Sequence, residues 1–473
     1  MPTRPAPRSL LSLQMPVLDA QIDLIDRCTA PELRGRVKEM RGLALRVASL
    51  PAPIGATVKI FSAGSPAPTP GQVVGFDGHE TVVMPLGSAE GIGPGDTVAA
   101  LHNTQQIRVG PTLLGRVLNG MGEPIDGRGP LQDTTPQPLH PAPLDPLDRP
   151  LIDQPLATGV RAIDAMTPLG RGQRLGVFAS PGVGKSTLLA TCAKHTAADV
   201  SVIALVGERG REVKHFIEHA LGEAGLARSV VVCATSDEPA LLRLRAAHTA
   251  AAIAESFRDR GLDVLLVMDS VTRFCQAQRQ VGLAAGEPPA TKGYPPSVFA
   301  QLPALLERSG RTAAGSITGL YSVLVEGDDP HEPIADACRG ILDGHVQLDR
   351  KLAEAGHYPA IDVPHSISRV ADDVTDPAHQ NARRQVLKLV AAYQKVEDLL
   401  NIGAYAAGSN PDFDLAITAK PAIDRLLQQG RGEVQGQADF AQTTAQLHAL
   451  NQLLDQTRQQ LAATQNKPHI RRR

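Results

Sequence analysis

Seven consecutive residues that could bind phosphate follow an apolar run of this chain. They are Pro181, Gly182, Val183, Gly184, Lys185, Ser186 and Thr187. A loop of this composition turns backbone N–H groups toward a polyphosphate, and the helix that follows adds its positive N-terminal end. We expect Lys185 to reach the β- and γ-phosphates of a nucleoside triphosphate and the Ser186 hydroxyl to bind Mg²⁺. The usual pattern begins with glycine, whereas this chain has Ala179. A glycine-rich turn with an incidental lysine is the alternative interpretation.

Acidic residues follow two further apolar runs that are typical of buried strands. Glu208 comes just after the run 200–206, and Asp269 comes directly after the run 263–268. Because ligands of an open parallel sheet bind at the carboxyl ends of its strands, both carboxylates are expected beside the ligand of Lys185. A carboxylate beside a γ-phosphate can orient and polarise an attacking water, which is the role expected of Glu208. Asp269 is expected on the Mg²⁺ side, since a buried carboxylate without a cation is costly.

Four other side chains are candidates by position. Arg209 and Glu212 follow Glu208 closely and could support it. A helix-terminal glutamate that only complements the helix dipole is the alternative for Glu208 itself. Arg369 follows a strand-like segment and could bring a guanidinium to the γ-phosphate, including that of a neighbouring subunit. Tyr358 could form an aromatic platform for adenine. A surface arginine and a core tyrosine are the simpler interpretations of these two residues.

Alternating strand-like and helix-like segments predict the element that positions these residues. Apolar runs separated by helices of moderate length call for a parallel sheet covered on both faces. Strands are expected at 174–179, 200–206, 229–234 and 263–268, and helices near 211–224 and 239–260. The phosphate loop, Glu208 and Asp269 then belong to one edge of an α/β core.

The composition and the hydrophobic pattern of the sequence change on both sides of this core. Short β-rich pieces between 35 and 100, separated by Gly, Pro and Asp, predict a small antiparallel barrel. The proline-rich stretch 130–157 predicts an extended connector that lies against a neighbouring domain. Residues 1–30 are expected to form a mobile arm with a short amphipathic helix around Leu18, Ile22 and Ile25.

Beyond Asp372 the pattern is helical. Helices are expected near 378–401, 411–429 and 434–463. The last of these is rich in Gln and carries a stripe of Leu447, Leu450, Leu454 and Leu461. We interpret this stripe as a packing face, with a coiled-coil partner site as the alternative.

Composition excludes several classes of function. The net charge is −2, from 47 basic and 49 acidic residues, which argues against a general surface for polyanions. Aromatic residues are only 3% of the chain and Trp is absent, so platforms for single-stranded nucleic acid are scarce. The sequence lacks the long apolar run of a membrane-spanning helix. Five dispersed cysteines suit reduced core thiols in the cytosol; they are Cys28, Cys192, Cys233, Cys275 and Cys338.

Five motifs that occur together in order resemble those of one family. They lie at 207–213, 286–299, 323–329, 341–345 and 357–362, and include GlyGluArgGlyArgGluVal and GlyGluProProAlaThrLysGlyTyrProPro. The chain resembles the type III secretion ATPases, relatives of the rotary ATP synthase β subunit, from about Gly35 to about Ile417. The resemblance implies a RecA-like P-loop core, an N-terminal barrel and a C-terminal helical domain. We expect an arm at 1–30, a barrel that joins subunits at 31–100, an ATPase domain at 101–375 and a helical domain at 376–473.

The resemblance also implies roles for single residues. Lys185 and Ser186 match the phosphate and Mg²⁺ residues, and Glu208 matches the catalytic glutamate. Asp269 matches the second acidic position of the family. The resemblance also implies that Arg369 is an arginine finger that acts on the nucleotide of a neighbouring subunit, and that Tyr358 is the aromatic residue that contacts adenine.

Partners follow from the resemblance as well. It implies a homohexameric, Mg²⁺-dependent ATPase whose sites lie between subunits. A stator protein would meet the N-terminal arm, a coiled-coil stalk would enter the ring, and chaperone–effector complexes would meet the helical domain. The location implied is cytoplasmic and peripheral to the inner membrane, with no specific nucleic acid.

The resemblance does not fix the branch of the family. The segment 233–250 favours the ATPases of injectisomes, whereas 403–411 is closer to flagellar export ATPases; we favour the injectisome branch. The catalytic subunit of a rotary ATP synthase, a nucleic-acid translocase ring and a non-catalytic ring subunit are less favoured functions. The carboxylate of Glu208 argues against the last of these. No motif of the chain indicates which substrates are exported. Nor does any motif indicate whether the energy of ATP unfolds these substrates, removes their chaperones or rotates the stalk.

Overall fold

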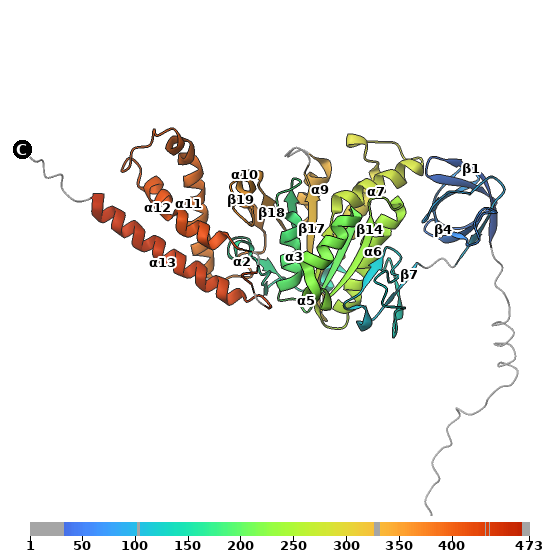
Figure 1. Cartoon of the computed structure of the whole chain (residues 1–473), viewed down its shortest axis with the longest axis horizontal. Coiled ribbons are helices and arrows are strands. Elements are labelled where there is room, and N and C mark those ends of the chain that lie inside the picture. Colours follow the sequence, from blue (N-terminus) through green and yellow to red (C-terminus); the bar gives the residue numbers. More distant parts are fainter. Residues whose placement is uncertain (1–32, 102–104, 326–331, 431, 435, 466–473) are drawn as a thin grey trace, which may run out of the picture. The chain divides into compact units, whose positions relative to one another are not determined.

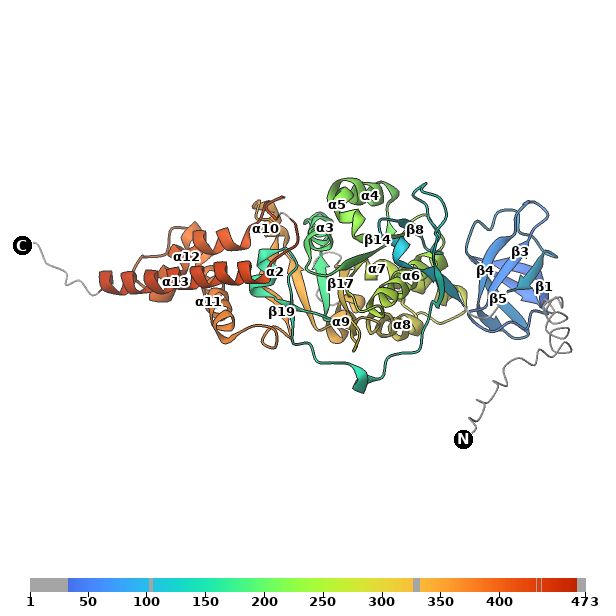
Figure 2. The same ribbon diagram turned by 90° about the horizontal axis from the view of Figure 1, so that it is seen from below.

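The computed structural model describes residues 33–101, 105–325, 332–430, 432–434 and 436–465. It divides into two compact units, one formed by 1–84 and 89–103 and the other by 85–88 and 104–473. The N-terminal arm, Cys28 and the arginine-rich C-terminal end, for which predictions were made, lie outside the described residues. Figures 1 and 2 give two views of the chain.

The first unit is a closed antiparallel barrel with strand order β1-β2-β5-β4-β3-β6, which confirms the predicted barrel. Its side chains alternate between the interior and solvent, as expected for strands with one buried face. Leu45, Val58 and Ile60 are fully buried in its centre. The strands are β1 (Arg34–Arg41), β2 (Ala44–Ala48), β3 (Thr57–Phe61), β4 (Thr69–Asp77), β5 (Glu80–Pro85) and β6 (Thr97–Ala100).

The second unit is built on a nine-stranded sheet, counted over the described residues, in the order β19-β18-β12-β17-β15-β13-β14-β8 with β16 paired to β17. All pairs from β18 to β8 are parallel, while β19 runs antiparallel to β18. The strands are β8 (Val117–Asn119), β12 (Arg174–Ala179), β13 (Val200–Glu208), β14 (Ser229–Thr235), β15 (Asp263–Asp269), β16 (Gly310–Arg311), β17 (Ser316–Leu324), β18 (Gly344–Leu348) and β19 (Ile361–Ser368). The parallel α/β core is therefore as predicted.

Helices cover both faces of this sheet. In Figure 2, α3, α4 and α5 lie on one side of it, and α6, α7 and α9 lie on the other. The helical segments of this unit are α2 (Arg161–Met166), α3 (Lys185–His195), α4 (Gly210–His215), the π-helical η3 (Phe216–Leu221), α5 (Gly222–Ala227), α6 (Ala240–Arg258), α7 (Val271–Ala284), α8 (Pro296–Leu306), α9 (Pro333–Ile341) and α10 (Arg350–Glu354). Because both faces are covered, the central strands are buried along most of their length: residues 200–207 of β13 are all buried.

Short elements run along the connector between the barrel and the core. β7 (Gln106–Val109) pairs with β9 (Thr135–Pro138), and β10 (Pro155–Leu156) pairs with β11 (Leu169–Gly170). The described residues include the 3-10 turns η1 (Pro111–Leu113) and η2 (Pro146–Asp148) and, between α7 and α8, η4 (Thr291–Gly293). The stretch 130–157 is mostly extended, and Arg149 fixes it to the core by donating to the carbonyls of Glu307 and Ser309.

Three helices follow the sheet: α11 (Pro377–Asn401), α12 (Pro411–Leu427) and α13 (Phe440–Gln465). The first two begin with a side-chain cap and a proline in the first turn: Asp376 caps α11 and Asn410 caps α12. Leu447, Leu450 and Leu454 are buried against the other helices, and Leu461 is partly buried, so the predicted stripe is a packing face. Figure 1 shows these helices beside α2, with which all three are in contact.

Candidate functional site

The phosphate loop joins the carboxyl end of β12 to the first turn of α3. Gly182 and Gly184 have φ angles of 87° and 94°, a left-handed backbone that favours glycine. Val183 is buried in the hydrophobic core and anchors the loop to it. Ala179, where the usual pattern has glycine, is the last residue of β12 and pairs with Leu324 of β17. The departure therefore lies in the strand and leaves the turn itself unchanged.

Lys185 is held by side chains from three other strands. Its ammonium forms an ion pair with Asp269, lies 3.9 Å from the Glu208 carboxylate and is 3.5 Å from the Ser322 hydroxyl. Ser322 also donates to the carboxylate of Asp269, over 2.7 Å. The lysine cation thus faces two carboxylates that the fold has brought together, and it offsets part of their mutual repulsion.

Sheet register explains why these groups meet. β17 lies between β12 and β15, and β13 lies beside β15. Asp269 ends β15 and pairs with Leu205, so Glu208 ends β13 slightly farther out along the same edge. Glu208 is thus the last residue of its strand rather than the first residue beyond it, and Gly207, with φ of 72°, turns the chain just before it.

Burial changes the acidity of Glu208. The pKa of the Glu208 carboxyl is raised to about 7, chiefly by burial and then by the negative charges of Asp269 and Glu212, while Lys185 opposes the shift. A carboxyl with a pKa near neutrality can exchange a proton with an attacking water at physiological pH. The environment of Glu208 therefore suits a general base.

A cavity of about 500 Å³ opens beside these groups. Its polar lining residues are Ser186, Thr187, Glu208, Arg211, Glu212, His215 and Asp269. Ser186, Glu208 and Asp269 supply the oxygen ligands that Mg²⁺ prefers when it is also bound to phosphate, so the donor set fits this ion. Arg209, in contrast, is not among the lining residues; its side chain is 68% exposed and pairs with Glu212 over 3.6 Å.

Tyr358 lies beside the phosphate loop. Its ring carbons are 3.5 and 3.7 Å from the position that a Cβ on Gly184 would occupy, and its side chain is half exposed. The backbone of Gln429, just after α12, donates to the Tyr358 carbonyl over 2.8 Å. An exposed aromatic face held next to the loop is suited to stack on a nucleotide base.

Arg369 lies at the opposite edge of the sheet. It follows β19, whose last residue pairs with Gly344 at the start of β18, and its backbone N–H donates to the carbonyl of Asp343. Asp343 in turn holds Arg174, the first residue of β12. The phosphate loop starts five residues farther along β12, about 17 Å away at 3.3 Å per residue. The chain therefore does not bring Arg369 to its own Lys185.

Three polar residues of the site were not predicted from the sequence: Ser322, Arg211 and His215, the last of which lines the cavity. Ser322 lies in β17, whose run 316–324 also contains Ser316, Thr318 and Gly319. No local pattern therefore distinguished Ser322 as a site residue. Arg211, on α4, lines the cavity instead of its neighbour Arg209, because the first turn of the helix sets which arginine faces inward.

Comparisons with known proteins agree with this geometry. Residues 159–368 match the model of the ATP synthase alpha/beta family, nucleotide-binding domain, and residues 375–449 match that of the T3SS EscN ATPase C-terminal domain. The flagellum-specific ATP synthase of Salmonella typhimurium is 52% identical to this chain, over 84% of the chain and 89% of the relative. The type 3 secretion system ATPase of Xanthomonas euvesicatoria is 48% identical over the same shares. This chain belongs to the family of type III secretion and flagellar export ATPases.

Solved structures support the same membership. The assembled ATPase EscN from the type III secretion system of enteropathogenic E. coli matches with a TM-score of 0.83 at 42% identity, over 88% of this chain and all of that one. Flagellar and secretion relatives have overlapping identities, 47–52% and 42–48%, so the injectisome branch stays a prediction. Among the described residues, no helix is both long and apolar enough to span a bilayer.

Proposed function

We propose that this family member hydrolyses ATP in a homohexameric ring and that hydrolysis energises the export of proteins through a type III secretion apparatus. The observation that carries the proposal is the meeting of Lys185 with Glu208 and Asp269, two carboxylates that line the cavity beside the phosphate loop. This arrangement provides a phosphate-binding cation, a carboxylate of suitable pKa and an acidic ligand at neighbouring positions.

Each residue has a defined task in this proposal. Lys185 and the backbone of the loop bind the β- and γ-phosphates, Tyr358 contacts adenine, and Glu208 orients the attacking water. Ser186 and Asp269 would hold Mg²⁺, which would neutralise negative charge on the phosphate oxygens. Arg209 remains a candidate for supporting Glu208, although its exposed side chain weakens that assignment.

A second copy of the chain completes the site. Arg369 lies at the far edge of the sheet from its own Lys185, so we assign its guanidinium to the γ-phosphate held by the neighbouring subunit. The barrel would join neighbouring subunits. These assignments require an assembled ring, and the solved relative EscN is described as assembled.

We propose further partners by analogy with other members of the family. A structure of EscN includes its central stalk, EscO, and we propose that an equivalent coiled-coil stalk enters the ring of this protein. A stator protein at residues 1–30 and chaperone–effector complexes at the helical domain complete the scheme. The ring would lie in the cytoplasm at the inner-membrane face of the apparatus, releasing chaperones from export substrates and unfolding them.

Phosphate release and protein export test the proposal together. The purified protein should release phosphate from ATP with Mg²⁺, and the Lys185→Ala variant should not. A strain that lacks the gene should stop secreting proteins and should recover only with the wild-type chain. Secreted needle proteins would indicate an injectisome, and secreted hook or filament proteins the flagellar alternative. Phosphate release without any effect on secretion would refute the export role.

A further inference from the structure

The linker between α12 and α13 returns to the nucleotide-binding core. Its last part meets the end of the phosphate-loop helix α3, where the N–H of Ala438 donates to the carbonyl of His195 over 2.6 Å. Its first part meets the loop that carries Tyr358, where the N–H of Gln429 donates to the Tyr358 carbonyl over 2.8 Å. The linker therefore joins the helical domain to two segments of the candidate nucleotide site.

The side chain of Gln429 adds a third segment to this contact. Its amide oxygen accepts from the N–H of Arg161 over 2.8 Å, and its amide nitrogen donates to the carbonyl of Gly159 over 2.8 Å. Because one end of the amide meets a donor and the other end meets an acceptor, both its position and its orientation are fixed. Gln429 thus links the end of α12, the start of α2 and the loop of Tyr358.

The start of α2 needs this acceptor from outside the helix. The N–H groups of a first helical turn have no acceptor within the helix. Arg161 is the first residue of α2, and the side chain of the preceding Val160 is apolar and cannot cap it. The Gln429 oxygen supplies the acceptor, and Arg161 Nε donates in return to the carbonyl of Leu426, near the end of α12, over 3.2 Å. Five of the six residues of α2 are buried, so Gln429 is anchored to a well-packed part of the core.

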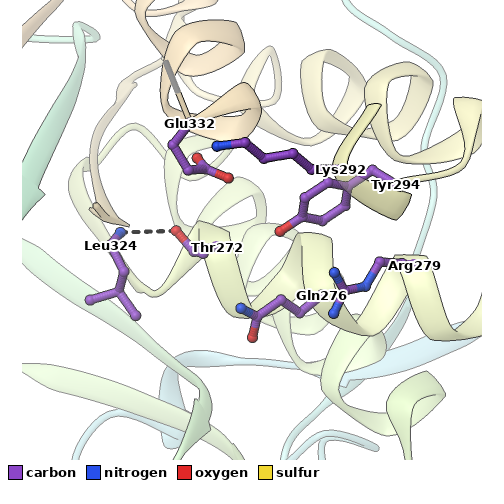
Figure 3. Close-up of a pocket in the computed structure, with 7 residues that line it drawn as sticks. All are labelled: Thr272, Gln276, Arg279, Lys292, Tyr294, Leu324 and Glu332. Atoms are coloured by element: carbon purple, nitrogen blue, oxygen red, sulfur yellow. Dashed lines mark hydrogen bonds between the residues drawn. The ribbon is translucent and has the colours of Figure 1, made fainter. Parts of the chain in front are cut away.

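A glutamine elsewhere in the core shows a different arrangement. Gln276 lines a second cavity, of about 380 Å³, together with Arg279 (Figure 3). This cavity is formed by α7, the segment around η4, the end of β17 and the residue before α9. The Gln276 oxygen accepts from Arg273 Nη1 over 3.0 Å, and both residues belong to α7. That bond stays within one helix, whereas the bonds of Gln429 join separate segments of the chain.

Tyr358 depends on its backbone for its position. It lies in the loop between α10 and β19, and its half-exposed ring lies beside Gly184 of the phosphate loop. A side chain on a loop is placed only as precisely as the backbone that carries it. Gln429 holds that backbone at the Tyr358 carbonyl, and the amide of Gln428 donates to Nδ1 of the preceding His357 over 3.2 Å. Loss of these bonds would free the ring to move relative to Gly184.

We propose that Gln429 is a positioning residue that fixes the ring of Tyr358 for stacking on adenine and thereby raises the affinity for ATP. Its amide is engaged by the start of α2, so Gln429 acts through Tyr358 and not through a contact with the nucleotide. The helical domain then contributes to the nucleotide site through its linker. The effect on affinity rests on the proposed role of Tyr358, whereas the placement of the ring does not.

The placement of the ring is tested in the full-length protein with Tyr358→Trp, because the chain contains no Trp of its own. Adding Gln429→Met keeps the length of the side chain and removes both bonds of the amide. The fluorescence anisotropy of the introduced indole should then fall, since a freed ring moves within nanoseconds. Gln380→Met is the matched control: Gln380 is also half-buried, and its amide donates to two carbonyls, those of Asp372 and Thr375, beside the start of α11.

The outcomes of this measurement are distinct. An unchanged anisotropy in folded Gln429→Met protein, or an equal fall in Gln380→Met, overturns the proposal. Where Gln429→Met does not fold, the same measurement is made on Gln429→Glu, which keeps the acceptor for Arg161 and loses only the donor to Gly159. A lower anisotropy in Gln429→Glu supports the proposal, and an unchanged one overturns it.

The effect on affinity is read in a double-mutant cycle. Gln429→Met should raise KM for ATP about threefold, the low end of the coupling between residues in contact, while kcat stays close to that of the wild type. In the Tyr358→Ala background the same change should leave KM unaltered, because the ring that Gln429 positions is gone. An equal rise in both backgrounds, or none in the wild-type background, overturns the effect on affinity. If Tyr358→Ala by itself leaves KM unaltered, the adenine role in the proposed function is refuted instead, and the anisotropy decides whether Gln429 holds the ring.

Discussion

The two edges of the central sheet hold very different sets of charges. At the carboxyl edge, Lys185 lies between Asp269, which is buried, and Glu208, which is mostly buried. At the amino edge, Arg369 is exposed, and its guanidinium donates to the carbonyl of Arg339. The first edge carries the residues expected to bind phosphate, and the second presents a cation to solvent. We propose that the two edges serve one reaction in neighbouring copies of the chain.

The largest expected effect tests the exposed edge. Arg369→Ala should lower the rate of hydrolysis by about 10³-fold or more, as expected when a guanidinium on the γ-phosphate is lost. Mixing Arg369→Ala with Lys185→Ala protein should restore activity, because some mixed interfaces have both groups intact. The rates of the mixtures and of each variant alone are measured as phosphate release.

Glu208→Gln provides the matched control for this mixing experiment. Glu208 and Lys185 lie in the same chain, so Glu208→Gln mixed with Lys185→Ala leaves every site defective. Recovery with Glu208→Gln, or none with Arg369→Ala in rings shown to be mixed, would contradict the assignment of Arg369 to the neighbouring subunit.

Glu208→Gln tests the buried edge. The change removes the negative charge and keeps the size of the side chain, so ATP binding should persist while kcat falls by about 10²–10⁴-fold. Equilibrium binding of a fluorescent ATP analogue and phosphate release separate the two effects. If the variant released phosphate at a rate close to that of the wild type, Glu208 would not be the base.

The pKa of Glu208 predicts the pH dependence. Because only the deprotonated carboxylate orients the water, kcat/KM should fall about tenfold per pH unit below 7 and level off above it. Glu212 contributes to the raised pKa, so Glu212→Gln should move the midpoint to lower pH. An unchanged midpoint in that variant would assign the titration to another group.

The smallest effect concerns adenine. Tyr358→Ala should raise KM for ATP about fivefold or more, the loss of one aromatic contact with a base. Tyr358→Phe keeps the ring and should stay close to the wild type in KM. Initial rates over a range of ATP concentrations decide this, and an unaltered KM in Tyr358→Ala would remove the residue from the site.

Local patterns in the sequence were sufficient for the carboxyl edge. The glycines at 182 and 184 predicted the loop because only a few residue types tolerate its backbone, and both have positive φ. The apolar runs before Glu208 and Asp269 predicted buried parallel strands, whose carboxyl ends share one edge. The barrel and the three C-terminal helices were also predicted from periodicity, although α13 begins at Phe440 and not near 434.

Contacts between distant segments were not predictable in the same way. The run 316–324 lacks a continuous apolar pattern, so its insertion between β12 and β15, and with it the bond from Ser322 to Asp269, depends on packing. The cavity beside Arg279 requires α7, the η4 segment and the residue before α9 to come together. The sequence separates these residues by up to about sixty positions, and no local rule relates them.

The sequence by itself determined which side chains end the strands and what chemistry they can perform, since loop conformation and burial follow from residue type over short distances. The tertiary structure alone decided where Arg369 lies, because a strand's direction depends on its neighbours and β19 runs antiparallel to β18. That reversal places the arginine about 17 Å along the sheet from the phosphate loop. The tertiary structure also decided the acidity of Glu208, because the raised pKa comes from burial beside Asp269 and is not a property of the residue itself.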